Sequence, residues 1–294
     1  MTLGLAYDFP RQDLGNKIMQ IIDGKKIRDE ILVKIKKEIT FLSFKPIFCD
    51  VLVSDDKASV QYVQMKKRNA EAVGIDFHHA NFLASISTED LIKEIKILNK
   101  VPNMCGIIIQ LPLPKNLDQK RILDAIDPSL DVDCLGEKAS NEFYSGKTDF
   151  GFPAALACMT LLNSINIDLT DKKIVVLGKG ELVGKPVTSL LRNKGLTPFV
   201  ISSETENKEK IIKEADVIIS GIGKGKYITG NMIKNGVILI DAGTSESGSG
   251  IIGDVDLKSV ENIASFVSPV PGGVGPVTVA ILLNNVLKVA KNLK

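Results

Sequence analysis

Tyr62 and Lys66 are residues whose types and spacing could serve acid–base chemistry. They stand four apart in a stretch that predicts a helix over residues 58–73, so their side chains share a face, and Ser59 lies one turn earlier on it. An amine acts as a base only where burial or nearby positive charge lowers its pKa. An aromatic residue and a lysine at this spacing are also common on half-exposed helices, so spacing alone does not establish catalysis.

Two further polar groups fall where α/β sheets place ligands. The apolar run 105–111 predicts a buried strand, and Gln110 lies at its carboxyl end, the edge at which such sheets bind small molecules. The segment 111–114 (Leu-Pro-Leu-Pro) must end that strand because proline cannot continue the ladder. Asp131 and Asp133 follow in a polar loop, where carboxylates are more often solvated than functional. Both positions remain open on this evidence.

A glycine-rich turn predicts a phosphate site in the second half of the chain. Gly178, Gly180 and Gly184 follow the apolar run 173–177 and precede a helix with Pro186 in its first turn. Their spacing, G-x-G-x-x-x-G, is one residue longer than the usual dinucleotide fingerprint. The first glycine makes the turn, the second admits a phosphate, and the helix N-terminus supplies free N–H groups. A tight turn without a ligand is the alternative, and the flanking strands favour binding.

The end of the next strand bears on which dinucleotide binds. An acid there would hold the ribose 2′-hydroxyl of NAD, and this chain has Ser202, Ser203 and Glu204. The serines, with Lys179 in the glycine turn, suit a 2′-phosphate, whereas Glu204 would repel one. The pattern favours NADP, and NAD remains possible.

A second glycine-rich segment precedes the last predicted helix. Residues 270–276 (Val-Pro-Gly-Gly-Val-Gly-Pro) fix an unusual backbone that can approach a ligand closely at Gly272 and Gly273. A purely structural hinge is the other interpretation.

Helical and apolar segments alternate along the chain, which predicts an α/β fold with two lobes and parallel sheets. The polar stretch 127–152 has no clear period and predicts the passage between the lobes. The second lobe is expected to be of the Rossmann type. The expected elements are helices 25–42, 58–73, 87–99 and 276–293, a helix that has Pro186 in its first turn and runs to residue 193, and strands 46–53, 105–111, 173–177, 198–202, 216–220 and 237–241.

Composition excludes several classes of protein. With 37 Lys and Arg against 35 Asp and Glu, nothing indicates a nucleic-acid partner. No apolar stretch approaches the roughly 20 residues of a membrane helix and the first residues do not form a signal peptide, so the protein is expected in the cytoplasm. The four cysteines form no CxxC pair and are expected to be buried free thiols, and no metal site is indicated.

Taken together, several segments resemble the bifunctional methylenetetrahydrofolate dehydrogenase/methenyltetrahydrofolate cyclohydrolase family. The resemblance runs from about Met19 to the C-terminus. Residues 1–18 precede it, and their use is left open. The carrying segments are Ser59-x-x-Tyr62-x-x-x-Lys66 with Gly74-Ile75, residues 106–114 (GIIIQLPLP), Asp131-Val132-Asp133, residues 178–186 (GKGELVGKP), residues 253–256 (GDVD) and residues 268–278 (SPVPGGVGPVT).

The resemblance implies a first domain of residues 1–150 with the helix 277–294 returning to it, and a Rossmann domain of residues 151–276. Folate is held between the two domains in this family, which is usually dimeric. Lys66 resembles the catalytic lysine of the cyclohydrolase step, Tyr62 the residue that stacks on the substrate, and Gln110 the partner of the lysine. Asp133 resembles the carboxylate that holds the pterin. The remaining folate positions are Leu111, Pro112, Gly272 and Gly273, and the dinucleotide positions are Gly178, Lys179, Gly180, Val183, Gly184, Ser203, Thr244 and Thr278.

The chain also departs from the family pattern. The usual Gly-Arg-Ser is Gly178-Lys179-Gly180 here, which loses a bidentate guanidinium and a hydroxyl and so weakens the case for strict NADP preference. Cys134 replaces a glycine after Asp133. The Pro-Cys-Thr-Pro-like segment is represented only by residues 152–155 (Phe-Pro-Ala-Ala), without its threonine.

The resemblance implies NADP-dependent oxidation of 5,10-methylenetetrahydrofolate to the 5,10-methenyl compound and hydrolysis of that product to 10-formyltetrahydrofolate. Two alternatives stay open at this point. One is a folate- or nucleotide-binding homologue that has lost its redox activity, which the altered glycine turn would suit. The other is an unrelated NAD(P) oxidoreductase of a small hydroxy or keto acid, which needs only the Rossmann lobe.

Overall fold

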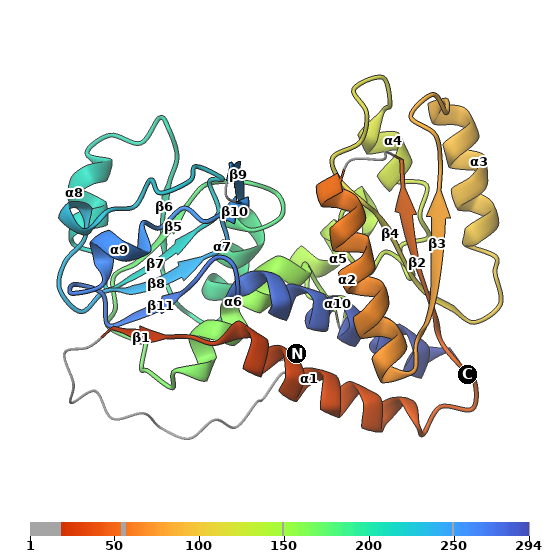
Figure 1. The fold of residues 1–294 in the computed structure, drawn as a ribbon, viewed down its shortest axis with the longest axis horizontal. Helices are drawn as coiled ribbons and strands as arrows, with labels where there is room; N and C mark the ends of the chain where they lie inside the picture. The colour runs from red at the N-terminus through yellow and green to blue at the C-terminus, as the bar shows by residue number, and fades with distance from the viewer. Residues whose placement is uncertain (1–18, 54–56, 149, 249, 294) are drawn as a thin grey trace. The chain divides into compact units, whose positions relative to one another are not determined.

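The structure is a computed structural model that describes residues 19–53, 57–148, 150–248 and 250–293 (Figure 1). The chain divides into two compact units. The first contains Asp29–Phe152 and the C-terminal stretch from Val279, and the second contains Pro153–Thr278 and the stretch that ends at Arg28. Residues 1–18, whose use the sequence leaves open, lie outside the described residues.

The first unit is built on a parallel sheet in the order β3-β2-β4. Every residue of β4 is buried, as expected for a parallel strand covered on both faces. A Cβ on Gly106 in β4 would come within 2.9 Å of Val132 and Val286, so this glycine lets the loop and the C-terminal helix approach the strand. The strands are β2 (Ile47–Leu52), β3 (Asp76–Asn81) and β4 (Met104–Ile109), and the helices are α1 (Gly24–Ile39), α2 (Lys57–Val73), α3 (Thr88–Leu98), α4 (Gln119–Leu123), α5 (Glu137–Tyr144) and α10 (Val274–Asn292).

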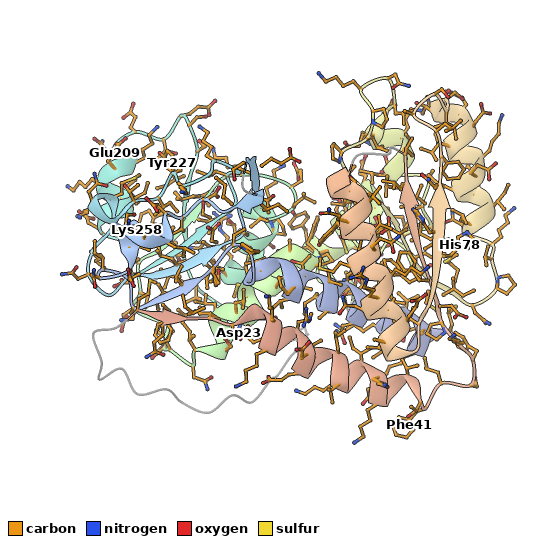
Figure 2. All side chains as sticks on the ribbon, viewed as in Figure 1. Asp23, Phe41, His78, Glu209, Tyr227 and Lys258 are labelled. Carbon is orange, nitrogen blue, oxygen red and sulfur yellow. The ribbon has the colours of Figure 1, made fainter. Side chains whose placement is uncertain are left out.

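Local signals set the ends of several of these helices. Asp23, labelled in Figure 2, accepts hydrogen bonds from the backbone N–H groups of Lys25 and Lys26 at 2.9 and 3.1 Å, at the start of α1. Ser87 accepts one from the Asp90 N–H at 3.1 Å and caps α3. Gly74 has φ +95° and ends α2 in the left-handed conformation.

The sequence analysis expected no regular element in residues 127–152 and placed the passage between the lobes there. The two units divide at the end of this stretch, after Phe152, but a helix forms within it. Helix α5 forms within this stretch and belongs to the first unit, burying Ala139 and Phe143 one turn apart. Eight residues carry too few apolar positions for a helical period to stand out. Strand β3 was also missed, because its exposed histidines hide the alternation; His78 is labelled in Figure 2.

The second unit has a six-stranded sheet in the order β1-β11-β8-β7-β5-β6, and all its pairings are parallel. The order reverses beside β5, since β6 lies on one side of it and β7 on the other, and such a switch point is where doubly wound sheets bind ligands. The elements are β1 (Gln20–Ile21), α6 (Pro153–Ser164), β5 (Ile174–Leu177), α7 (Gly184–Asn193), β6 (Phe199–Ile201), α8 (Lys208–Lys213), β7 (Val217–Ser220), the 3-10 helix Gly230–Met232, β8 (Ile238–Asp241), β9 (Ser245–Ser247), β10 (Gly250–Ile252), α9 (Leu257–Val260) and β11 (Phe266–Ser268).

The start of the described chain lies with the second unit, although the sequence-based boundary put residues 1–150 in the first. The Gln20 N–H donates to the Ser265 carbonyl and the Ile22 N–H to the Val267 carbonyl, both at 2.9 Å, which adds β1 to the sheet edge. A two-residue strand leaves too short a pattern to read from sequence. Helix α10 contributes to both units, which divide between Thr278 and Val279.

Of the helices that the structure describes, α10 is the one that is long and apolar enough to cross a membrane, judged by length and composition alone. Of its most apolar window, 67% is buried within the structure, including Leu283 and Val286, as in the core helix of a globular protein. All four cysteines are buried free thiols, as predicted.

Candidate active site

Lys66 is the centre of a buried polar cluster in the first unit. It projects from α2 and is 1% exposed. Its Nζ donates a hydrogen bond to Gln110 Oε1 at 2.7 Å and lies 4.9 Å from the centre of the Tyr62 ring. Gln110 donates its own Nε2–H to the Leu111 carbonyl at 2.7 Å, which turns the amide oxygen toward the lysine. The structure therefore brings Gln110 to the Tyr62–Lys66 pair, which the sequence had singled out separately from it.

Asp50 completes this cluster, and the sequence analysis missed it. It lies in β2, is 0% exposed, and its Oδ2 is 2.5 Å from Lys66 Nζ. Burial raises the pKa of the Asp50 carboxyl, while the charge of Lys66 lowers it. A visible signal was available, since an aspartate stands inside the otherwise apolar run Ile47–Leu52.

Asp133 lies within electrostatic reach of the same lysine. Burial and the charges of Asp131 and Asp50 raise the pKa of its carboxyl to about 7, against the opposing effect of Lys66. Asn285 of α10 holds the loop by donating its Nδ2–H to the Val132 carbonyl at 2.9 Å. The acid that the resemblance assigns to the pterin thus belongs to the electrostatic environment of Lys66.

The neighbouring Cys134 adopts φ +59°, a left-handed conformation that L-residues rarely take. The resemblance places a glycine here, and the conformation explains why a residue without a Cβ would suit the position. The backbone keeps the glycine-like turn despite the cysteine side chain.

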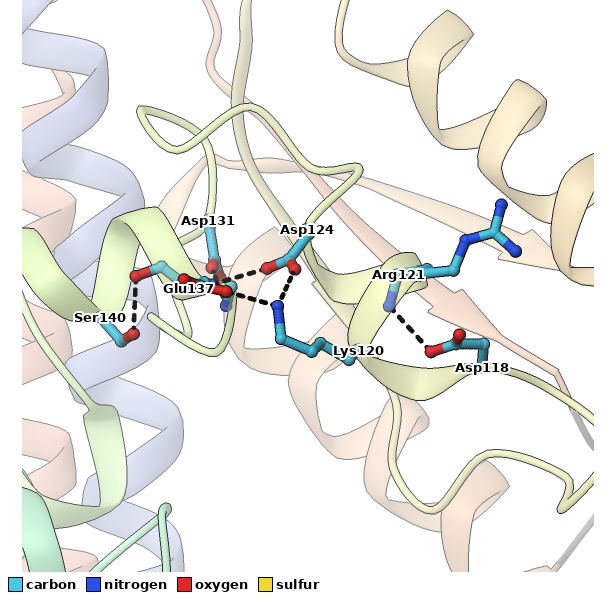
Figure 3. A network of polar contacts seen from close by, with 8 residues as sticks. Asp118, Lys120, Arg121, Asp124, Asp131, Glu137 and Ser140 are labelled. Carbon is cyan, nitrogen blue, oxygen red and sulfur yellow. Dashed lines mark hydrogen bonds and ion pairs between the residues drawn. The ribbon is translucent and has the colours of Figure 1, made fainter.

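A network of polar contacts fixes the loop that carries Asp133 (Figure 3). Asp131 Oδ2 accepts a hydrogen bond from the Gly136 N–H at 2.7 Å, and Asp124 Oδ1 accepts one from the Glu137 N–H at 2.7 Å. Lys120 Nζ contacts Asp124 Oδ2 at 2.9 Å and also pairs with Glu137. These contacts tie α4 to the start of α5 and so hold the segment between them.

A pocket of about 450 Å³ is lined by this network and by α5, including Asp124, Asp131 and Glu142. None of Lys66, Gln110 or Asp133 is among its lining residues. The pocket is therefore separate from the lysine cluster. Leu111, which is half-buried, and Pro112, which is exposed, follow Gln110 and are joined by a cis peptide bond.

The glycine turn of the second unit has the geometry that close packing requires. Gly178 follows β5 with φ +102°. A Cβ on Gly184 would lie 2.2 Å from the Gly178 carbonyl oxygen, so only glycine allows α7 to start there. Nothing lies within 4 Å of a Cβ built on Gly180, and Lys179 beside it is exposed. Val183 is buried, and a Cβ on Gly221 after β7 would lie 3.0 Å from its side chain.

The other predicted dinucleotide positions lie on loops of the same unit. Ser203 follows β6 and is exposed, and Thr244 follows β8 and is also exposed. Thr278 is in α10 and donates its hydroxyl to the Val274 carbonyl at 3.0 Å. Ser203 and Thr244 thus follow two strands of the same sheet, β6 and β8, which are separated by β5 and β7. Thr278 uses its hydroxyl proton within its own helix.

The Gly272–Gly273 backbone is tightly packed against the start of α1. Gly272 has φ +110°, and a Cβ on Gly24 would lie 1.9 Å from the Gly273 carbonyl oxygen. Glycine at position 24 is therefore required by a backbone-to-backbone approach that the sequence analysis did not foresee.

These features define a class: an α/β protein with one unit of Rossmann type and another that carries a buried acid–base cluster. The chain matches the tetrahydrofolate dehydrogenase/cyclohydrolase catalytic domain over residues 22–133 and the NAD(P)-binding domain of the same family over residues 153–294. It belongs to the tetrahydrofolate dehydrogenase/cyclohydrolase family.

Individual relatives cover nearly the whole chain. The bifunctional protein FolD of Nautilia profundicola is 41% identical over 278 residues, 93% of this chain and 98% of that protein. The crystal structure of the bifunctional enzyme FolD from Campylobacter jejuni has a TM-score of 0.89 at 35% identity and covers 93% of this chain and 99% of that one. The Trypanosoma brucei enzyme, complexed with NADP cofactor and inhibitor, has a TM-score of 0.88 at 30% identity and covers 94% of this chain and 98% of that one. The predicted family and fold class are thereby confirmed.

Proposed function

We propose that this chain oxidises 5,10-methylenetetrahydrofolate with NADP and hydrolyses the 5,10-methenyl product to 10-formyltetrahydrofolate. Its relatives are bifunctional FolD proteins, and the family match covers both a catalytic and an NAD(P)-binding domain. The observation that carries the proposal is the buried Lys66, hydrogen-bonded to Gln110 and set over Tyr62. The unrelated oxidoreductase considered from sequence is excluded by the family membership.

The second unit fits a dinucleotide. The open space above Gly180 and the start of α7 leave room and N–H groups for a pyrophosphate, so we assign phosphate contacts to Gly178, Gly180, Val183 and Gly184. NADP supplies the acceptor for the hydride that leaves the one-carbon bridge of the substrate. The folate nitrogens stabilise the resulting cation, so the chain's task in this step is to align the two molecules.

Cofactor preference depends on exposed groups. Lys179 and Ser203 would hold a 2′-phosphate, with Thr244 and Thr278 placed as further cofactor contacts. Exposed Glu204 opposes a 2′-phosphate by its charge. We propose NADP as the preferred cofactor and NAD as a weaker substitute.

The hydrolytic step needs a proton acceptor, and we assign this role to Lys66. Water attacks the methenyl carbon, forming a C–O bond as the electron pair of the C=N⁺ bond returns to nitrogen, and one of its protons passes to the neutral lysine amine. The bond from this carbon to N5 then breaks, N5 takes a proton from the lysine and the hydroxyl loses its own, which leaves the formyl group on N10. Gln110 orients the amine, and Tyr62 stacks on the folate. Asp133 accepts hydrogen bonds from the amino-pyrimidine edge of the pterin. Leu111, Pro112, Gly272 and Gly273 are proposed as further contacts with the folate.

A spectrophotometric assay tests the proposal. The protein is incubated with methylenetetrahydrofolate and either NADP or NAD, and the formation of reduced nicotinamide is followed by its absorbance. Turnover with NADP exceeding that with NAD is expected. No turnover with either cofactor contradicts the proposal, and folate binding without dinucleotide binding in calorimetry identifies a homologue that has lost its redox activity.

Assembly and location are proposals at the same level. We propose a homodimer in the cytoplasm, as the family resemblance implies, with no nucleic-acid or membrane partner. Light scattering during gel filtration should give about twice the mass of one 31.9 kDa chain.

A further inference from the structure

Asp50 has an unusual place for a carboxylate. It stands inside β2, paired in register with His79 of β3 on one side and Ile108 of β4 on the other, and its side chain is fully buried. Apart from the contact with Lys66 Nζ at 2.5 Å, no described group donates a hydrogen bond to either of its oxygens. Its environment therefore depends on one partner.

An apolar side chain would fill this buried strand position at a lower cost in desolvation free energy. Taking a carboxylate out of water costs several kcal/mol, and a buried ion pair recovers that cost only with excellent geometry and further hydrogen bonds. Asp50 lacks those further hydrogen bonds among the described residues, so its negative charge acts mainly on the amine of Lys66. Conversely, a lysine buried without a counter-ion tends to lose its proton.

Other titratable groups face the pair from each neighbouring element. Tyr62 projects from α2, Asp133 from the loop between α4 and α5, and His79 from β3. Lys66 and His79 both lower the pKa of the Asp50 carboxyl, against the larger effect of burial. Asp50 is the group in direct contact with Lys66, whereas Asp133 interacts with it only through its charge.

The two acceptors also direct the amine. Asp50 Oδ2 and Gln110 Oε1 lie 2.5 and 2.7 Å from Lys66 Nζ, so two N–H groups of the amine are committed to them. Tetrahedral geometry then fixes the direction of the remaining position on nitrogen. In the ammonium this position holds a proton, and in the neutral amine it holds the lone pair that can take a proton from water.

We propose that Asp50 is a positioning residue that holds Lys66 as an ammonium and thereby sets the balance between the two activities of the chain. The inference rests on the proposed function. Hydride transfer needs no base, but hydrolysis needs the neutral amine. Loss of the third proton leaves the Asp50 carboxylate buried without a counter-charge, so Asp50 opposes it. The chain accordingly favours hydride transfer over hydrolysis at neutral pH.

Asp50→Asn tests this directly, because it keeps the size and an oxygen acceptor but removes the charge. Both rates are measured in the same sample between about pH 6 and 10, with the background rate of the Lys66→Met variant subtracted. Removing an opposite charge at this distance should lower the pH at half-maximal hydrolysis by about 1–3 units. The ratio of hydrolysis to hydride transfer at pH 7 should rise at least about tenfold, since each unit of pKa changes the neutral fraction about tenfold.

Asp76→Asn is the matched control, since Asp76 on the adjacent strand β3 forms an exposed ion pair with Lys45. It should change neither the ratio nor the profile. An Asp50→Asn profile that coincides with that of the parent protein overturns the inference. If both activities are present but unshifted, only the inference fails, whereas absence of both activities in the parent contradicts the proposed function.

Two measurements protect the test against poor folding or an inactive protein. In the parent protein, hydrolysis should keep rising to at least about pH 9, because the Asp50 carboxylate in contact with the amine favours its charged form. A plateau below about pH 8 overturns the inference. NMR titration of the Lys66 ε-carbon in both proteins reports the charge without turnover, and an equal midpoint in the Asp50→Asn variant overturns it as well.

Discussion

The two units bury carboxylates in opposite ways. In the first unit, Asp50 depends on the titratable amine of Lys66. In the second, Asp254 is also 0% exposed but accepts hydrogen bonds from Ser220 Oγ at 2.6 Å and from the backbone N–H groups of Ile222 and Lys224 at 2.9 and 2.7 Å. Backbone donors do not titrate, so Asp254 holds its loops in one arrangement, whereas the Asp50–Lys66 pair changes with the protonation of its partner.

Asp241 repeats the second arrangement. Its carboxylate accepts from the N–H groups of Gly243, Asp254 and Val255, at 2.9, 3.1 and 2.8 Å. Burial raises the pKa of the Asp241 carboxyl to about 6, although these donors favour its charged form. The loops after β7 and β8 are thus tied together by paired acids, which fixes the backbone beside Thr244. The comparison contrasts a static support for the cofactor with a titratable centre for hydrolysis.

Lys66→Met tests the buried ion pair of the first unit and should have the largest effect. Removing the amine should lower the kcat for methenyltetrahydrofolate hydrolysis by about 10²–10⁴-fold, the usual contribution of a positioned base, while hydride transfer persists. Stopped-flow absorbance of the methenyl compound measures the loss. Hydrolysis that continues at the parent rate shows that another group takes the proton.

Asp254→Asn tests the buried carboxylate of the second unit. The amide keeps one acceptor oxygen but places an NH₂ group against buried donors, leaving one or two of them unpaired at about 1–3 kcal/mol each. The free energy of unfolding should fall by about 3 kcal/mol, and urea denaturation followed by circular dichroism measures it. If Asp254 were an exposed surface acid instead, the change would stay within about 0.5 kcal/mol.

The titratable character of the first unit predicts a pH dependence of folate binding. The pKa of the Asp133 carboxyl is raised to about 7, so it is increasingly protonated below that pH and loses its capacity to accept two hydrogen bonds from the pterin. The KM for methylenetetrahydrofolate should rise about tenfold for each pH unit below 7. Asp133→Asn should raise KM at pH 8 and abolish this dependence. A KM that is constant from pH 5.5 to 8 contradicts the assignment.

The sequence predicts the scaffold better than the contacts within it. Strand and glycine patterns locate β5, the turn at Gly178 and the start of α7, because these depend on local backbone geometry. The pairing of Asp50 with Lys66 depends on β2 and α2 meeting in three dimensions, and no local pattern encodes it. Spacing placed Lys66 on one face with Tyr62, but burial, which decides its chemistry, came only from packing.

The same reason explains the missed Gly24. A glycine before a helix has an ordinary local explanation, yet a Cβ there would meet the Gly273 carbonyl, almost 250 positions along the chain, at 1.9 Å. Close approaches between distant segments leave no periodic trace in the sequence. Residues that are conspicuous by type, such as an acid in an apolar strand, are the signals that could have been used.

Two glycine substitutions test whether the backbone of the second unit is fixed by close packing at the glycine turn. Gly184→Ala puts a Cβ 2.2 Å from the Gly178 carbonyl oxygen, so the backbone must shift. We expect the free energy of unfolding to fall by about 1–3 kcal/mol and NADP affinity to fall with it. Gly180→Ala meets no atom within 4 Å, so it should leave unfolding unchanged and weaken only NADP binding, where the methyl group opposes the phosphate.

Calorimetry with NADP and urea denaturation of the same two samples separate these effects. Because hydrolysis of added methenyltetrahydrofolate depends on groups of the first unit, Gly180→Ala should reduce it less than it reduces hydride transfer. Equal losses of both activities would contradict the assignment of hydrolysis to the first unit and of cofactor binding to the second. A loss confined to hydride transfer would place the titratable chemistry in the first unit and assign the second to holding the cofactor.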